Sequence, residues 1–136
     1  MNPRVNYPKI SPAVAVGGQT SGLTWLTNFF AACNGGCTVD YVAFHWYDSV
    51  NNIDSLRNAI QTYYSQFGKP LWITEIGFID GDQAAQVAAL QQVISILGPD
   101  SRVFRYAYYY CGEGYLLNGD GTGLSQLGQA WCTVHT

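Results

Sequence analysis

The chain has 136 residues, enough for one domain with a buried core. Hydrophobic residues make up 48% of it and charged residues 11%, which excludes a disordered chain. The net charge is −3, with six lysines and arginines, so nucleic acid and anionic membrane surfaces are poor partners. No apolar run approaches the ~20 residues of a membrane span.

Four strand-then-helix units follow one another along the chain, and we interpret residues 1–136 as a single domain. Residues 1–12 hold three of the five prolines and predict an extended lead-in. Short apolar or β-branched runs predict strands at residues 13–18, 40–47, 70–78 and 103–110.

Each predicted strand is followed by apolar residues at helical spacing. We expect the first helix to be capped by Thr20 or Ser21 and the second by Asn52, with Gly68 ending the second. A last helix is expected to start over residues 126–131. The predicted apolar stripes are Leu23, Leu26, Phe29, Phe30 and Cys33; Ile53, Leu56, Ile60, Tyr63, Tyr64 and Phe67; and Val87, Leu90, Val93, Ile94 and Leu97.

Strands that alternate with crossover helices predict an α/β fold with a parallel sheet. Four such units are compatible with a small open sheet, or with half of a (β/α)8 TIM barrel, which takes ~250 residues. An unrelated small α/β binding domain is one alternative. A nucleotide-binding version is disfavoured because the nearest Gly-rich segment, residues 17–22, lacks the lysine of a phosphate-binding loop.

The four cysteines allow three pairings. Cys33 and Cys37 are close enough in sequence to close a small loop, and a Cys111–Cys132 bond would tie the last strand to the last helix. We expect disulfides, and therefore an extracellular or cell-wall protein, with two free buried pairs as the alternative. The two histidines do not supply the short paired spacings of a zinc site, so we expect no metal and no cofactor.

The predicted strand at residues 70–78 carries one carboxylate, Glu75, near its C-terminal end. A charge in so apolar a run is costly unless it has partners or a task. Ligands and chemistry collect at this end of parallel strands. The alternative is a carboxylate that a neighbouring donor simply satisfies.

Side-chain alternation predicts which residues accompany Glu75. We expect one rim with a carboxylate, an imidazole and phenols, walled by two tryptophan rings. A carboxylate in such a setting can act as nucleophile or base. Taken alone, the histidine and the tyrosines would be ordinary core or strand packing. The residues assigned to this rim are His45, Trp46, Tyr47, Trp72, Ile73, Gly77, Tyr106, Tyr108 and Tyr110.

Several motifs recur in order: SPAV at 11–14, GLTWL at 22–26, CTVDYVAFHWY at 37–47, KPLWITE at 69–75, RYA at 105–107 and LSQLGQA at 124–130. Together they resemble glycoside hydrolase family 128. The resemblance implies an eight-unit barrel, of which this chain supplies strands five to eight, and retaining cleavage of β-1,3-glucan.

The same resemblance implies residue roles. Glu75 matches the family's nucleophile on its seventh strand, and His45 and Tyr47 match sugar-site residues on the sixth. Tyr108 stands where such enzymes usually place a tryptophan platform. Tyr106 is expected at the site from strand alternation.

The family's acid/base glutamate belongs to an Asn-Glu-Pro motif that this chain does not contain. Retaining enzymes need two carboxyl groups ~5–5.5 Å apart. The remaining acids after strands are Asp48, Asp80 and Glu113, which we expect to be ordinary loop residues. The alternatives to a catalytic domain are therefore a non-catalytic carbohydrate-binding remnant and a fragment of a longer enzyme.

A half barrel would leave unpaired strand edges near Val14 and Tyr106 and would expose aromatic side chains on its inner face. Both features promote association. We therefore expect either further chain beyond these residues or self-association through the open edges.

Overall fold

The computed structural model describes residues 7–17 and 21–134. Thr20, a predicted helix cap, and His135 lie outside these residues. The observed elements are β1 (Val14–Ala15), α1 (Leu23–Cys33), β2 (Val42–Asp48), α2 (Asp54–Phe67), β3 (Leu71–Phe78), α3 (Gln83–Leu97), β4 (Val103–Tyr108) and α4 (Gln126–Thr133). The four predicted strand–helix units are confirmed.

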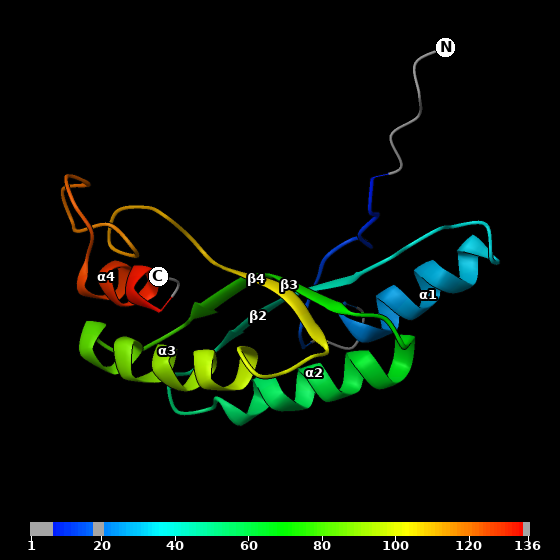
Figure 1. The fold of residues 1–136 in the computed structure, drawn as a ribbon, viewed down its shortest axis with the longest axis horizontal. Helices are drawn as coiled ribbons and strands as arrows, with labels where there is room; N and C mark the ends of the chain where they lie inside the picture. The colour runs from blue at the N-terminus through cyan, green and yellow to red at the C-terminus, as the bar shows by residue number, and fades with distance from the viewer. Residues whose placement is uncertain (1–6, 18–20, 135–136) are drawn as a thin grey trace, which may run out of the picture.

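The four strands form one parallel sheet in the order β1-β2-β3-β4, so β1 and β4 are its edges. Figure 1 shows α1, α2 and α3 along one side of the strands, with no helix of the described chain on the other side. The sheet therefore has a helix-covered face and an open face. The predicted α/β class with a parallel sheet is confirmed, and a sheet covered on one side is compatible with half of a TIM barrel.

The core lies between the sheet and its helices. Leu56 and Ile60 of α2 and Val93 of α3 are fully buried against the strands. Burying such a side chain contributes roughly 1.5–3 kcal/mol, so this layer supplies most of the stability. The buried strand residues on this side are Val14, Val42, Phe44, Trp46, Leu71, Ile73 and Ile76.

A β-bulge in β3 changes which residues face the helices. Phe44 of β2 pairs with Ile73, but the next residue, His45, pairs with Glu75, which leaves Thr74 as an extra residue. Ile73 is fully buried in the helix-side core. The prediction that Ile73 shares a face with Glu75 is therefore wrong, because a bulge reverses the alternation at the residue it inserts.

Two predicted helix caps are also wrong. The residue before α1 is Gly22, with no side-chain cap, and Ser21 instead donates its hydroxyl to the Gly17 carbonyl. The residue before α2 is Ile53, and the Asn52 amide donates to Asp48. Both polar side chains serve local turns, as Ser and Asn commonly do.

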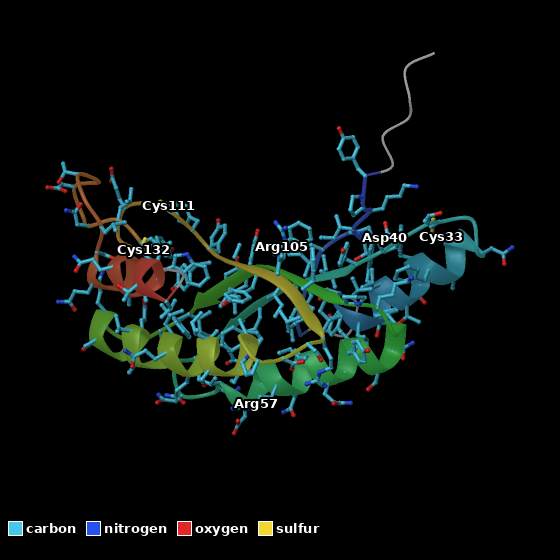
Figure 2. All side chains as sticks on the ribbon, in the orientation of Figure 1. Cys33, Asp40, Arg57, Arg105, Cys111 and Cys132 are labelled. Atoms are coloured by element: carbon cyan, nitrogen blue, oxygen red, sulfur yellow. A yellow bond between two sulfur atoms is a disulfide. The ribbon has the colours of Figure 1, made fainter. Side chains whose placement is uncertain are left out.

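One of the two predicted disulfides forms. Cys33 and Cys37 are bonded in the turn after α1, which confirms that pairing. Cys111 and Cys132 are free and exposed, so the prediction of a bond between them is wrong. Cys111 lies where the main chain turns from Tyr110 to Gly112, and Cys132 lies on an exposed side of α4, as Figure 2 labels them. Positions in the sequence alone do not show which cysteines are bonded.

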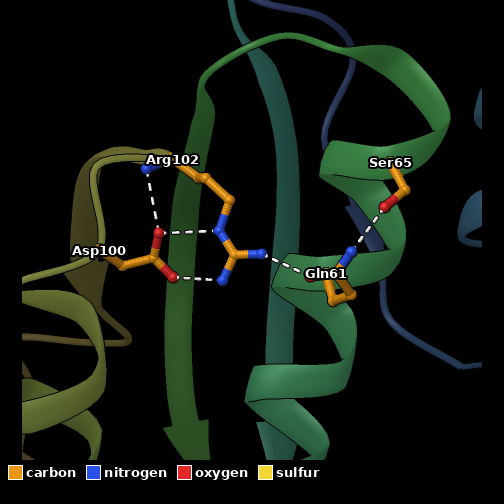
Figure 3. A network of polar contacts seen from close by, with 4 residues as sticks. All are labelled: Gln61, Ser65, Asp100 and Arg102. Atoms are coloured by element: carbon orange, nitrogen blue, oxygen red, sulfur yellow. Dashed lines mark hydrogen bonds and ion pairs between the residues drawn. The ribbon is translucent and has the colours of Figure 1, made fainter.

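A polar network fixes the start of β4 to α2 (Figure 3). Arg102 forms a two-pronged ion pair with Asp100, with Nε–Oδ1 and Nη2–Oδ2 distances of 2.9 and 2.7 Å. Its third nitrogen, Nη1, donates to Gln61 at 2.7 Å, and Gln61 in turn donates to Ser65. The edge strand is thereby held at its N-terminal end.

Candidate functional site

The register of β2 against β3 brings three predicted site residues together. His45 lies opposite Glu75, and Tyr47 lies opposite Gly77, near the C-terminal ends of both strands. The bulge at Thr74 makes this alignment possible, since without it His45 would face Thr74. The three side chains therefore share the open face of the sheet.

Both polar partners of Glu75 contact the same carboxylate oxygen. The Tyr47 hydroxyl donates to Oε2, and His45 Nδ1 lies 3.1 Å from that oxygen. Among the described residues, no hydrogen bond reaches Oε1 of Glu75. About 30% of the Glu75 side chain and 26% of His45 are exposed, so a ligand can reach them.

The surroundings of Tyr47 keep its hydroxyl protonated, so it can donate a hydrogen bond to Glu75. Burial and the adjoining Glu75 carboxylate raise the pKa of Tyr47 well above its usual range. The phenol therefore keeps its proton throughout neutral and mildly alkaline pH. It holds Glu75 as an oriented carboxylate with one free oxygen, which is the state that a nucleophile or a base needs.

Gly77 makes room for the Tyr47 ring. A Cβ atom at position 77 would lie 2.8 Å from two carbons of that ring, closer than side-chain atoms pack. Gly77 therefore matters for space rather than for backbone freedom. Strand alternation predicted Gly77 on the Glu75 face, and the structure shows that its lack of a side chain leaves room for Tyr47.

Besides Ile73, three residues assigned to the site lie on the other face of the sheet. Trp46 is 1% exposed, and its indole N–H donates to Ser55 of α2. Tyr106 and Tyr108 pack on Trp131 of α4, with ring centroids 5.9 and 5.7 Å away. The prediction that these three side chains lie beside Glu75 is therefore wrong.

The cause is a parity error in the edge strand. Tyr106 and Tyr108 do share a face, as predicted, but the shifts in β3–β4 pairing put that face against the helices. Burial there raises the pKa of Tyr108 to about 12. Trp72 lies three residues before Glu75 and packs on Tyr41 and Phe104, near the start of the strands.

Of the three consecutive tyrosines at the end of β4, the one that reaches the site is Tyr109, which was not predicted from the sequence. Its ring meets Tyr47 edge-on at 5.7 Å, and its main-chain N–H donates to Ile76. Tyr109 takes the place on the open face that had been assigned to Tyr108. Three consecutive tyrosines gave no sequence signal for choosing among them, because the choice depends on the register.

The other acids near strand ends are engaged in turns. Asp48 accepts hydrogen bonds from Ser55 and Asn52, and Asp80 accepts one from the main chain of Val50. Burial opposes ionisation of Asp48, but its hydrogen bonds outweigh burial and lower its pKa. No described carboxyl group hydrogen-bonds with His45, Tyr47 or Glu75, other than Glu75 itself.

Within residues 7–17 and 21–134, no three metal-ligating side chains gather into a possible metal site. In the same part of the chain, no helix combines the length and the apolar character needed to cross a bilayer.

Comparison with known proteins identifies relatives. The model of a family described as glycosyl hydrolase catalytic core matches residues 2–131. A search of curated proteins found no match. Among solved structures, a curdlan-specific exo-β-1,3-glucanase of glycoside hydrolase family 128 from Blastomyces gilchristii is 30% identical, with a TM-score of 0.77. That similarity covers 91% of this chain and 53% of the fungal enzyme.

Two further family 128 structures differ in what they do. An endo-β-1,3-glucanase from Amycolatopsis mediterranei, solved with laminaripentaose, is 27% identical over 90% of this chain and 56% of that one, with a TM-score of 0.77. An oligosaccharide-binding protein from Trichoderma gamsii is 26% identical over 81% and 46%, with a TM-score of 0.67. This chain spans about half the length of these proteins.

Proposed function

Because this chain belongs to the glycosyl hydrolase catalytic core family and, within it, to glycoside hydrolase family 128, we propose that it acts on β-1,3-glucan with Glu75 as the nucleophile of a retaining mechanism. The observation that carries the proposal is the convergence of Tyr47 and His45 on one oxygen of Glu75. Membership of the family also removes the alternative of an unrelated small α/β binding domain.

In the proposed first step, the Oε1 atom of Glu75 attacks the anomeric carbon of a glucosyl unit. A bond forms between that carbon and Oε1 while the bond to the leaving oxygen breaks, and the leaving oxygen takes the electron pair. Tyr47 and His45 hold Oε2 and fix the attack geometry. Water then hydrolyses the glycosyl ester.

The leaving oxygen of a glucan must also receive a proton, which Glu75 cannot supply while it attacks. The only other glutamate, Glu113, lies in the loop between β4 and α4 and has no described contact with Glu75. We assign the proton donor to a carboxyl group outside the described residues, on further chain or on an associated partner. General acid catalysis contributes ~10²–10⁴-fold, so the chain alone is expected to turn over natural glucan slowly.

Because the nucleophile and the proton donor are separate groups, a substrate that needs no proton donor can test Glu75 alone. A 2-deoxy-2-fluoro glucoside with a dinitrophenolate leaving group needs no proton donor, and its fluorine slows hydrolysis of the ester. We expect the wild-type chain to gain the mass of one fluoroglucosyl group, located on Glu75 by peptide mass spectrometry. Glu75→Gln should gain none, and Glu113→Gln, the matched control, should label like the wild type. Labelling of Glu75→Gln at the wild-type rate would remove Glu75 from the mechanism.

A second candidate function is carbohydrate binding without catalysis. It is favoured by the single carboxylate at the described site and by an oligosaccharide-binding protein among the family's solved structures. Binding of laminari-oligosaccharides by calorimetry, together with no adduct on Glu75, would support this alternative over the catalytic proposal.

Two further expectations stay proposals. We propose an extracellular or cell-wall location, which the Cys33–Cys37 disulfide supports because such bonds persist in oxidising compartments. We also propose that the open face and the edges β1 and β4 associate with further chain or with another copy.

A further inference from the structure

Three tyrosines, here called the tyrosine ledge, follow β4 on the way to α4: Tyr109, Tyr110 and Tyr115. Each exposes a little over 40% of its surface. Aromatic rings as large as these are usually covered, and a contiguous exposed group marks a binding surface more often than single exposed rings do.

The ledge is continuous with the proposed catalytic residue. Tyr47, the partner of Glu75, touches Tyr109 at 5.7 Å between ring centroids. Tyr109 touches Tyr110 at 5.0 Å, and Tyr110 touches Tyr115 at 4.8 Å. The rings therefore form an unbroken row that leads from Glu75 outward over the loop.

The main chain beneath the ledge is fixed rather than loose. Gly112 donates its N–H to the Tyr110 carbonyl at 3.0 Å, and the Tyr110 ring lies so close that a Cβ at Gly112 would come within 2.2 Å of it. The Tyr115 carbonyl accepts from Ser125, the capping residue of α4, at 2.6 Å. The rings are thus anchored to α4, and binding would require little ordering of the loop.

The few charged residues in the segment that carries the ledge indicate which class of ligand it binds. No lysine or arginine occurs in residues 106–136, and the only acids there are Glu113 and Asp120. A nucleic acid or another polyanion would find no counter-charge on this loop. A neutral ligand with flat C–H faces and hydroxyl groups suits phenol rings, which offer a stacking surface and a polar edge.

We propose that Tyr110 and Tyr115 form a stacking site for glucosyl units of a β-1,3-glucan, beyond the unit held at Glu75. The inference rests on the proposed function, and it adds a dependence of affinity on glucan length that Glu75 alone does not give. Tyr109 links the two sites, and Tyr110 and Tyr115 bind the chain as it leaves the catalytic residue.

Calorimetric titration with laminari-oligosaccharides, from laminaribiose to laminarihexaose, tests this site. In the Glu75→Gln background, which prevents turnover, we expect affinity to rise with chain length. Tyr110→Ala and Tyr115→Ala should each weaken laminarihexaose binding about three- to tenfold, the loss expected for one aromatic contact, and leave laminaribiose binding unchanged. The control is Tyr64→Ala, which removes an exposed tyrosine from α2.

Two additions keep the test decisive. Tyr110→Phe and Tyr115→Phe keep the rings and should retain the length dependence, even if the alanine variants fold poorly. In NMR spectra of the unmodified chain, the ring signals of Tyr110 and Tyr115 should shift on adding laminarihexaose but not laminaribiose.

The failures are distinguishable. If no oligosaccharide of any length binds the wild-type chain, the proposed function itself fails. If glucans bind equally at all lengths, or if the alanine variants leave laminarihexaose binding intact, only the ledge proposal is overturned. If those variants instead abolish self-association seen by sedimentation while binding is unchanged, the ledge contacts a second copy of the chain and not a sugar.

Discussion

At the scale of single residues, the site depends on the Glu75 carboxylate, whose Oε2 atom contacts Tyr47 and His45. It also depends on the glycine at position 77. Tyr47 keeps its proton because burial and Glu75 raise its pKa, so the donor role is insensitive to pH over the neutral range. The position of its ring depends on Gly77, whose hydrogen leaves the space that the ring fills.

We therefore expect Gly77→Ala to disturb the site more than the fold. The added methyl group would push the Tyr47 ring away from Glu75, with an overpacking cost of about 1–3 kcal/mol in unfolding free energy. Labelling of Glu75 by the fluoroglucoside should slow by about tenfold or more, since the lost hydrogen bond to a charged group is worth about 1.5–3 kcal/mol.

Gly119→Ala is the matched control, because no atom lies within 4 Å of a Cβ at that position. It should label at the wild-type rate. If Gly77→Ala labels as fast as Gly119→Ala, the Tyr47 ring does not need the space at position 77.

At the scale of elements, the edge strand β4 is tied to α2 through Asp100 and Arg102 (Figure 3). The hydrogen bonds from Arg102 hold the pKa of Asp100 below its usual range. A carboxyl group with a lowered folded-state pKa stabilises the fold above its unfolded pKa, and that contribution is lost as the pH falls through the folded pKa.

We expect Asp100→Asn to lower the unfolding free energy by about 1 kcal/mol at pH 7, a modest figure because solvent reaches the Arg102 side of the pair. The difference from the wild type should shrink as the pH drops below about 4, where an unpaired aspartate takes up its proton. Urea unfolding followed at pH 7 and at pH 3 measures both effects.

Asp54→Asn provides the comparison, because Asp54 forms a solvent-exposed ion pair with Arg57, with an Nε–Oδ1 distance of 3.6 Å. That variant should change stability little at either pH. An Asp100→Asn deficit that stays the same at pH 3 would show that the carboxylate charge is not what holds β4.

At the scale of the whole molecule, the helices among residues 7–17 and 21–134 cover one face of the sheet only. Its open face carries Trp72, Phe104 and Arg105, and Figure 2 shows Arg105 on the side of the strands opposite Arg57 of α2. A parallel sheet is stable in water when both faces are covered, and its edge strands pair with other chains when they are free.

We expect the chain to associate at micromolar concentrations, with a sedimentation coefficient that rises with concentration. Ala107→Lys places a charge on the exposed edge strand β4 and should shift the equilibrium toward monomer. Ala88→Lys, at an exposed position in α3, should leave association unchanged. A wild-type chain that remains monomeric would contradict association through the edges.

Much of this protein followed from local patterns in the chain. Helical spacing and strand-forming runs determined the four βα units, because each element's burial repeats at its own period. The sequence also indicated the position of Glu75 at the end of an apolar strand and the short Cys33–Cys37 loop. It contained the motifs that resemble family 128.

What only the tertiary structure decided was register and facing. The bulge at Thr74 brought His45 opposite Glu75, and the pairing of β4 turned Tyr106 and Tyr108 to the helices and Tyr109 to the site. The structure also shows that Cys111 and Cys132 are free. A strand's side chains alternate with period two, so one inserted residue exchanges its faces, and that insertion is fixed by pairing between strands rather than by the strand's own sequence.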